Sequence, residues 1–128
     1  MSEKMHELTG TQPDFELCQA VSLTWNELKE MMDSGLCTIG SHTVSHPGLD
    51  RIGQPACVSE LLDSRKRIKE MLSVDAFHFS YPHSMRNESV QKAVVEAGYV
   101  SAVLGYGGRV RRGDDPYGLN RKYIIQND

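Results

Sequence analysis

The sequence predicts an α/β fold in which about four strands alternate with helices. Short apolar runs of strand length alternate along the chain with longer segments whose apolar residues recur at helical spacing. Such alternation is typical of βαβ units, whose strands form a mostly parallel sheet. Polar motifs follow two of the predicted strands, and enzymes built on parallel sheets carry their chemistry at the carboxyl ends of the strands.

Three helices are predicted from capping residues and apolar periodicity. The first begins with the capping box Thr24-Trp25-Asn26-Glu27 and ends at Gly35, which favours a left-handed stop. The second begins near Pro55 and carries an apolar stripe through about residue 72. The third spans roughly Asn87 to Ala97.

The predicted strands are short and lie between or after these helices. They cover residues 37–41, which read as a buried strand, then 77–81, 99–104 and 121–125. The expected order is therefore α-β-α-β-α-β-β. Residues 1–20 carry little periodicity, so we expect a loosely ordered lead-in there and one domain over residues 21–128.

Composition excludes several classes of protein. The chain has 128 residues, enough for one domain, and a net charge of −3 without a basic stripe, so no nucleic-acid partner is expected. The apolar stretches are too short to span a bilayer, so no membrane partner is expected. The segment Met1–Glu7 lacks the apolar stretch of a signal peptide, which predicts a cytoplasmic location. The three cysteines fit no zinc-finger spacing and are expected to be free thiols.

The most informative local feature is a pair of histidines, His42 and His46, in a stretch bracketed by Gly40 and Gly48. Pro47 disfavours helical geometry at His46, so we expect a tight turn that leaves a strand. Such a turn can direct both imidazoles at one point, and imidazole is a common ligand of zinc and other late divalent metals. The spacing alone leaves open that both are loop histidines without a ligand.

The context of these histidines resembles the central motif region of the polysaccharide deacetylase family, which includes chitooligosaccharide and poly-N-acetylglucosamine deacetylases. The segment His42-Thr43-Val44-Ser45-His46-Pro47 matches every fixed position of that family's motif of His, Ser or Thr, two free positions, His, and Pro or Ser. The segment Phe79–Ser84 is similar to a further motif, often Phe-x-Tyr-Pro-Tyr-Gly, with His83 and Ser84 in place of the last two residues. Segments 97–103 and 119–121 are similar to later parts of the family domain.

The resemblance covers about residues 15 to 125 and implies a partial (β/α) barrel of the polysaccharide deacetylase type, since the family barrel has about seven strands. It implies metal-dependent removal of acetyl groups from an N- or O-acetylated oligo- or polysaccharide. A divalent metal, zinc or alternatively cobalt, nickel or manganese, would be held by His42 and His46. Tyr81 and Pro82 would bind substrate, and the backbone N–H of His83 would stabilise the oxyanion.

The sequence departs from the family where the acid and base are concerned. It contains no Thr-Phe-Asp-Asp-Gly motif and no late Leu-x-His motif. Its adjacent pair, Asp114-Asp115, precedes Pro116 and is expected to form a turn. His78 alternates with phenylalanines and is expected to pack.

Two explanations of these departures stay open. The chain is either part of a longer enzyme, or a reduced protein that has kept a metal- or saccharide-binding role. A third possibility is an α/β interaction module whose histidines carry no function. Because a half-barrel leaves strand edges unpaired, we also expect a homo-oligomer, a two-fold dimer that closes the incomplete barrel.

Overall fold

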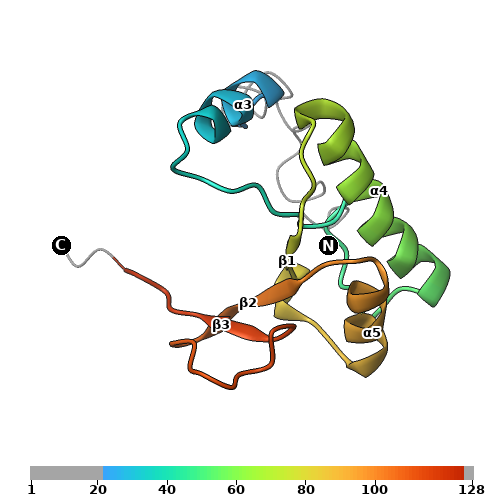
Figure 1. Ribbon diagram of the computed structural model, residues 1–128. Helices are drawn as coiled ribbons and strands as arrows, with labels where there is room; N and C mark the ends of the chain where they lie inside the picture. Colours follow the sequence, from blue (N-terminus) through green and yellow to red (C-terminus); the bar gives the residue numbers. More distant parts are fainter. Residues whose placement is uncertain (1–21, 126–128) are drawn as a thin grey trace, which may run out of the picture. The chain divides into compact units, whose positions relative to one another are not determined.

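The computed structural model describes residues 22–125 of the chain (Figure 1). The chain divides into two compact units, with the boundary between Leu36 and Cys37, and each unit is described by itself. The predicted lead-in over residues 1–20 lies outside the described residues, so the domain boundary predicted after it stays a prediction.

In the first unit, helix α3 spans Trp25–Asp33 and begins as its capping box predicts. The Thr24 hydroxyl accepts a hydrogen bond from the Glu27 N–H at 3.2 Å, and the Glu27 carboxylate accepts one from the Thr24 N–H at 2.7 Å. The bonds that the N–H and the hydroxyl of Thr24 donate to the Glu27 carboxylate lower its pKa. The helix ends at Asp33 with Ser34 as its C-cap, and the next residue, Gly35, has the left-handed φ of +74° expected of a glycine stop.

The second unit is built on a three-stranded, fully parallel sheet in the order β1-β2-β3. The strands are β1 (His78–Ser80), β2 (Ser101–Gly107) and β3 (Leu119–Arg121). Phe79 of β1 is aligned with Ala102 of β2, and Val103 of β2 with Leu119 of β3. The parallel sheet with its helices confirms the predicted α/β class, that of a partial barrel.

The strand predicted over residues 37–41 does not form. Only Ser41 pairs with β1, in a single parallel bridge with Phe79. The last strand was predicted over residues 121–125 but forms at Leu119–Arg121. Its partner β2 ends at Gly107, which is aligned with Arg121. Residues 122–125 therefore lack a pairing partner on β2. Three strands and one bridge thus stand where four strands were predicted.

Helices α4 (Gln54–Leu72) and α5 (Glu88–Glu96) lie close to their predicted positions, and a single 3₁₀ turn, η1 (Pro82–Ser84), follows β1. Helix α5 is capped by Asn87, whose side chain accepts from the Val90 N–H at 2.9 Å. None of the helices among residues 22–125 combines the length and the apolar content that crossing a bilayer requires.

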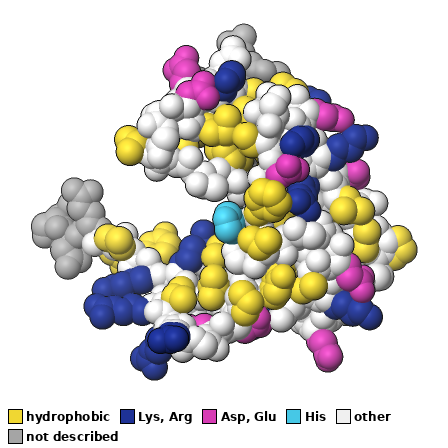
Figure 2. Space-filling model, in the orientation of Figure 1, with side chains coloured by type: hydrophobic (Ala, Val, Ile, Leu, Met, Phe, Trp, Pro, Cys, Tyr) yellow, Lys and Arg dark blue, Asp and Glu magenta, His cyan; other side chains and the backbone are white. Residues whose placement is uncertain are grey.

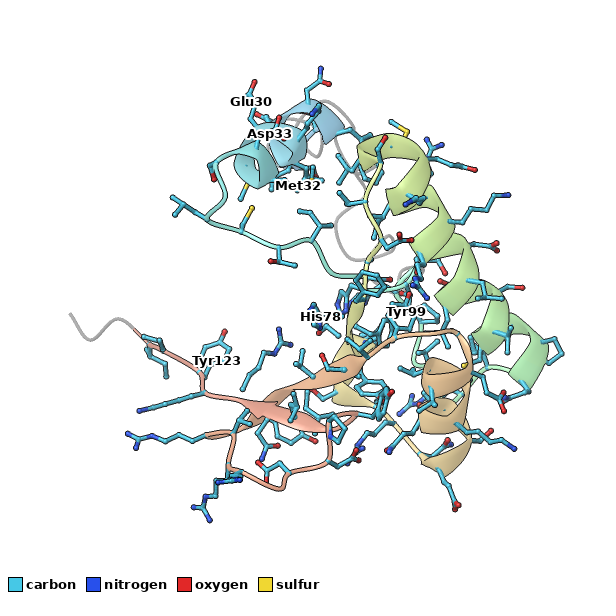
Figure 3. The ribbon with its side chains drawn as sticks, viewed as in Figure 1. Glu30, Met32, Asp33, His78, Tyr99 and Tyr123 are labelled. Carbon is cyan, nitrogen blue, oxygen red and sulfur yellow. The ribbon has the colours of Figure 1, made fainter. Side chains whose placement is uncertain are left out.

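The core of the second unit joins the sheet to α4 and α5. Leu61 of α4 and Val94 of α5 are completely buried, and Phe79 of β1 is 1% exposed. The ring of Tyr99 lies 5.1 Å from that of Phe79, and its hydroxyl donates to the Leu61 carbonyl at 2.8 Å (Figure 3). The buried hydroxyls of Ser41 and Ser64 share a hydrogen bond of 2.7 Å, so the core satisfies its polar groups.

This packing predicts different costs for two adjacent leucines of α4. Leu61→Ala should lower the free energy of unfolding by about 2–5 kcal/mol, because it leaves a cavity in the core. Leu62→Ala, at a side chain 46% exposed, should change it by less than about 0.5 kcal/mol. Urea denaturation of both variants measures the difference, and equal losses would contradict the packing described here.

Candidate metal-binding site

The candidate site lies where two motif segments leave the sheet side by side, at the carboxyl end of β1. The Ser41 N–H donates to the His78 carbonyl at 2.8 Å, and the Ser80 N–H donates to the Ser41 carbonyl at 2.9 Å. His42 follows directly after Ser41, and Tyr81 directly after Ser80. The two motifs therefore meet at one edge, as the sequence predicts.

His42 is oriented by a hydrogen bond to the sheet. Its Nδ1 lies 2.7 Å from the Ser80 carbonyl oxygen. Because a carbonyl oxygen only accepts, Nδ1 carries a proton, and in the neutral imidazole Nε2 then keeps its lone pair. Metal-binding histidines commonly donate their other ring N–H to a carbonyl in this way, since the bond fixes both the tautomer and the ring.

His46 lies beside His42, with the ring centroids 4.7 Å apart and the ring planes at 68°. The two side chains are thus neighbours, as expected from their spacing. The backbone of the turn between them is strained. Its φ is +69° at Thr43 and +60° at His46, a conformation that residues other than glycine rarely adopt. One tie within the turn is a bond from the His46 N–H to the Thr43 hydroxyl at 3.0 Å.

A second tie comes from Glu60 on helix α4. Its Oε2 accepts hydrogen bonds from the Val44 N–H at 2.7 Å and the Ser45 N–H at 3.0 Å, and its Oε1 accepts one from the Ser45 hydroxyl. Partial burial opposes the charge of Glu60, but these three bonds outweigh it and hold the pKa below its usual value. Glu60 is a residue that the sequence analysis did not identify.

His83 brings a third imidazole to the same edge. Its ring centroid lies 4.6 Å from that of His46. The residue has a φ of +56°, and the bonds of this turn are donated by Ser84 and Met85 rather than by His83. Within residues 22–125 no acceptor contacts the His83 N–H.

Tyr81 and Pro82, the two residues expected to bind substrate, are buried. Tyr81 is 1% exposed, and its hydroxyl donates to the Tyr117 carbonyl at 2.8 Å. Burial raises the pKa of Tyr81 to about 12 and outweighs the opposing effect of Arg86. Both side chains pack in this structure and lead the chain into the turn that carries His83, and their role in binding substrate stays a prediction.

Arg121 reaches the site from β3, the edge strand on the far side of β2 from β1. Its Nε donates to the Leu104 carbonyl at 2.6 Å, and one terminal nitrogen donates to the Ser80 hydroxyl at 3.1 Å. Ser80 thus contacts both His42 and Arg121, through its carbonyl and its hydroxyl respectively. Arg121 belongs to one of the similar segments noted in the sequence, but nothing in the sequence assigned it to the site.

The carboxylates Asp114 and Asp115 form a turn, as predicted. Asp114 accepts from the Arg111 N–H at 2.7 Å and Asp115 from the Tyr117 N–H at 2.9 Å. The bond from Tyr117 is the main cause that lowers the pKa of Asp115. Both carboxylates are therefore occupied in holding the loop.

The histidine pair supplies two nitrogen donors suited to a late divalent metal. Over residues 22–125, no group of three or more His, Cys, Asp or Glu side chains is arranged to hold an ion. His42 and His46 thus fit as part of a metal site whose further ligands the described residues do not supply. Asp14 lies outside these residues.

Two expectations about other residues are resolved. His78 does not pack in the core: its side chain is exposed, and its Nδ1 lies 2.8 Å from the Ser101 hydroxyl (Figure 3). The side chains of β1 alternate, and Phe79 is the one that faces inward. Cys37 and Cys57 are free thiols, as expected, and burial raises the pKa of Cys57.

Comparison with known proteins identifies the class to which this chain belongs. The sequence profile of the polysaccharide deacetylase family matches residues 6–102. The chain therefore belongs to the polysaccharide deacetylase family.

Individual relatives agree with this assignment. YxkH of Bacillus subtilis (strain 168), assigned to the polysaccharide deacetylases, is 33% identical over 99 residues, which are 77% of this chain and 35% of YxkH. The deacetylase PplD of Streptococcus pyogenes, solved in complex with acetate, has a TM-score of 0.79 at 25% identity, over 86% of this chain and 48% of PplD. The polysaccharide deacetylase BC0361 of Bacillus cereus shares the fold, with a TM-score of 0.72 at 23% identity, over 79% of this chain and 32% of BC0361. The chain thus spans 32–48% of the length of these relatives.

Proposed function

We propose that this chain carries the histidine half of a metal-dependent deacetylase site, which removes acetyl groups from an N- or O-acetylated saccharide. The observation that carries the proposal is the pairing of His46 with a His42 ring whose Nδ1 bonds to the Ser80 carbonyl, which leaves Nε2 available. Membership of the polysaccharide deacetylase family supports the substrate class.

Each residue of the site has a part in this chemistry. His42 and His46 would hold zinc or a related divalent metal, which when bound polarises a water and an acyl carbonyl. The His83 N–H, which has no acceptor among the described residues, would donate to the oxyanion that develops on the acyl group.

A second candidate function is binding without turnover. It is favoured by the lack of a third ligand and of a free carboxylate base beside the histidines in residues 22–125. In that case the chain would be a metal- or saccharide-binding module that keeps the family scaffold. The two candidates differ in whether acetate is released.

Metal binding is the first test of the proposal. The wild-type chain should bind Zn²⁺ or Co²⁺ weakly, because two neutral imidazoles hold a dication without a carboxylate. His42→Ala and His46→Ala should each abolish binding, whereas His78→Ala should leave it unchanged, since that exposed ring bonds to Ser101. Isothermal titration calorimetry measures all four proteins. Equal binding by the three variants would refute the site.

Catalysis is expected to be slow in the isolated chain. The loss of a positioned base typically costs about 10²–10⁴-fold in rate. Acetate release from an N-acetylglucosamine oligomer with added metal should therefore fall well below about 1 s⁻¹, the lower end of common turnover numbers. Release at or above that rate would mean that a carboxylate of this chain, such as Asp14 or Asp114, supplies the base.

We also propose that the chain forms a homodimer that closes the incomplete barrel. Apolar side chains remain on the surface of the second unit (Figure 2), and those of Tyr123, Ile124 and Ile125 are 71% exposed or more. Burying such side chains against a second copy would stabilise the unit, with an interface of upwards of about 1,000 Å². Sedimentation at micromolar concentration should give twice the chain mass. A monomer of 14.3 kDa would contradict the proposal.

A further inference from the structure

We infer that Glu60 is a positioning residue, whose carboxylate holds the turn between His42 and His46 in the shape that lets both imidazoles bind one ion. The inference rests on the proposed metal site and adds to it a residue from a different element. Glu60 lies on α4, whereas the turn lies between the bridge residue Ser41 and the loop that leads to α4.

The contacts of Glu60 are concentrated on the part of the turn between the two histidines. Three donors bond to one carboxylate: the N–H groups of Val44 and Ser45 and the Ser45 hydroxyl. Val44 and Ser45 lie between His42 and His46 in sequence, and Glu60 follows them by 16 and 15 residues, respectively. The bonds therefore fix the middle of the turn from outside.

The turn needs such an external tie because of its backbone conformation. Thr43 has a β-branched side chain and a φ of +69°. This backbone conformation is unfavourable for such a residue, so contacts from the surrounding structure must offset its free-energy cost. His46 has a φ of +60° as well. The bond between the Thr43 hydroxyl and the His46 N–H closes the turn on itself but does not attach it to the rest of the unit. Glu60 supplies that attachment.

A carboxylate suits this role better than an amide would. Two successive backbone N–H groups that point to one place form a concavity that favours an anion. Ionised Glu60 offers only acceptors, so it can take both N–H groups on Oε2 and the Ser45 hydroxyl on Oε1. The lowered pKa of Glu60 agrees with a carboxylate that stays charged while it accepts these bonds.

Asp63 provides a matched control on the same helix. A cavity of about 480 Å³ between the turn and α4 is lined by both Glu60 and Asp63. Asp63 is exposed and makes no hydrogen bond to the turn within residues 22–125. A substitution there changes the charge of the cavity wall and leaves the three bonds of Glu60 in place.

The experiment compares the full chain with Glu60→Ala, Glu60→Gln and Asp63→Ala. Zn²⁺ affinity is measured by competition with a chromophoric chelator, and amide hydrogen exchange of Val44 and Ser45 is measured by NMR without metal. Glu60→Ala should weaken Zn²⁺ binding about 10- to 100-fold, the range seen when a group that orients metal ligands is lost. It should also speed the exchange of both amides.

Glu60→Gln should give a smaller change in the same direction, because its single carbonyl oxygen can still accept from the turn. Asp63→Ala should match the wild type in both measurements. Circular dichroism reports whether each variant is folded. If Glu60→Ala does not fold, Glu60→Gln decides the matter with the same two readouts.

Unchanged Zn²⁺ affinity and unchanged amide exchange in a folded Glu60 variant would overturn the inference, as would equal effects of Glu60→Ala and Asp63→Ala. Failure of the proposed function looks different. A wild-type chain that binds no Zn²⁺ would refute the metal site, while the exchange of the Val44 and Ser45 amides would still decide whether Glu60 holds the turn.

Discussion

The bridge between Ser41 and Phe79 is the constraint on which the rest of the site depends. Two backbone hydrogen bonds, to the His78 carbonyl and from the Ser80 N–H, align the chain before His42 with β1. Gly40 permits this approach, because a Cβ there would lie 3.0 Å from the His78 carbonyl oxygen. The Ser41 hydroxyl extends the attachment to Ser64 on α4. Two segments that are far apart in sequence thereby leave the sheet together.

The turn that follows the bridge combines strain with hydrogen bonds from two sides. Residues held at positive φ typically cost about 1–3 kcal/mol each, so a turn with two of them persists only where its surroundings impose it. The sheet orients His42 through the Ser80 carbonyl, and helix α4 holds the middle of the turn through Glu60. The two imidazoles are thus brought together before any ion binds, which reduces the ordering that metal binding requires.

Local signals in the sequence predict the helices well and the strands less well. The capping box at Thr24 and the cap at Asn87 are complete within a few residues, so both helices begin where expected. A strand depends on its partner, and neither the single bridge at Ser41 nor the end of β3 at Arg121 follows from local sequence. The site follows the same rule: a short motif identifies the histidine pair, whereas the contact from Glu60 crosses 15 residues and leaves no local signal.

The central claim is that the fold orients His42 with a protonated Nδ1 and a free Nε2, ready to bind an ion beside His46. Long-range ¹H–¹⁵N NMR correlation of the histidine side chains at a pH where His42 is neutral tests it directly. The account predicts the Nδ1–H tautomer for His42, with the Nε2 resonance moving when Zn²⁺ is added. An Nε2–H tautomer, or a His42 spectrum that does not respond to Zn²⁺, would contradict it.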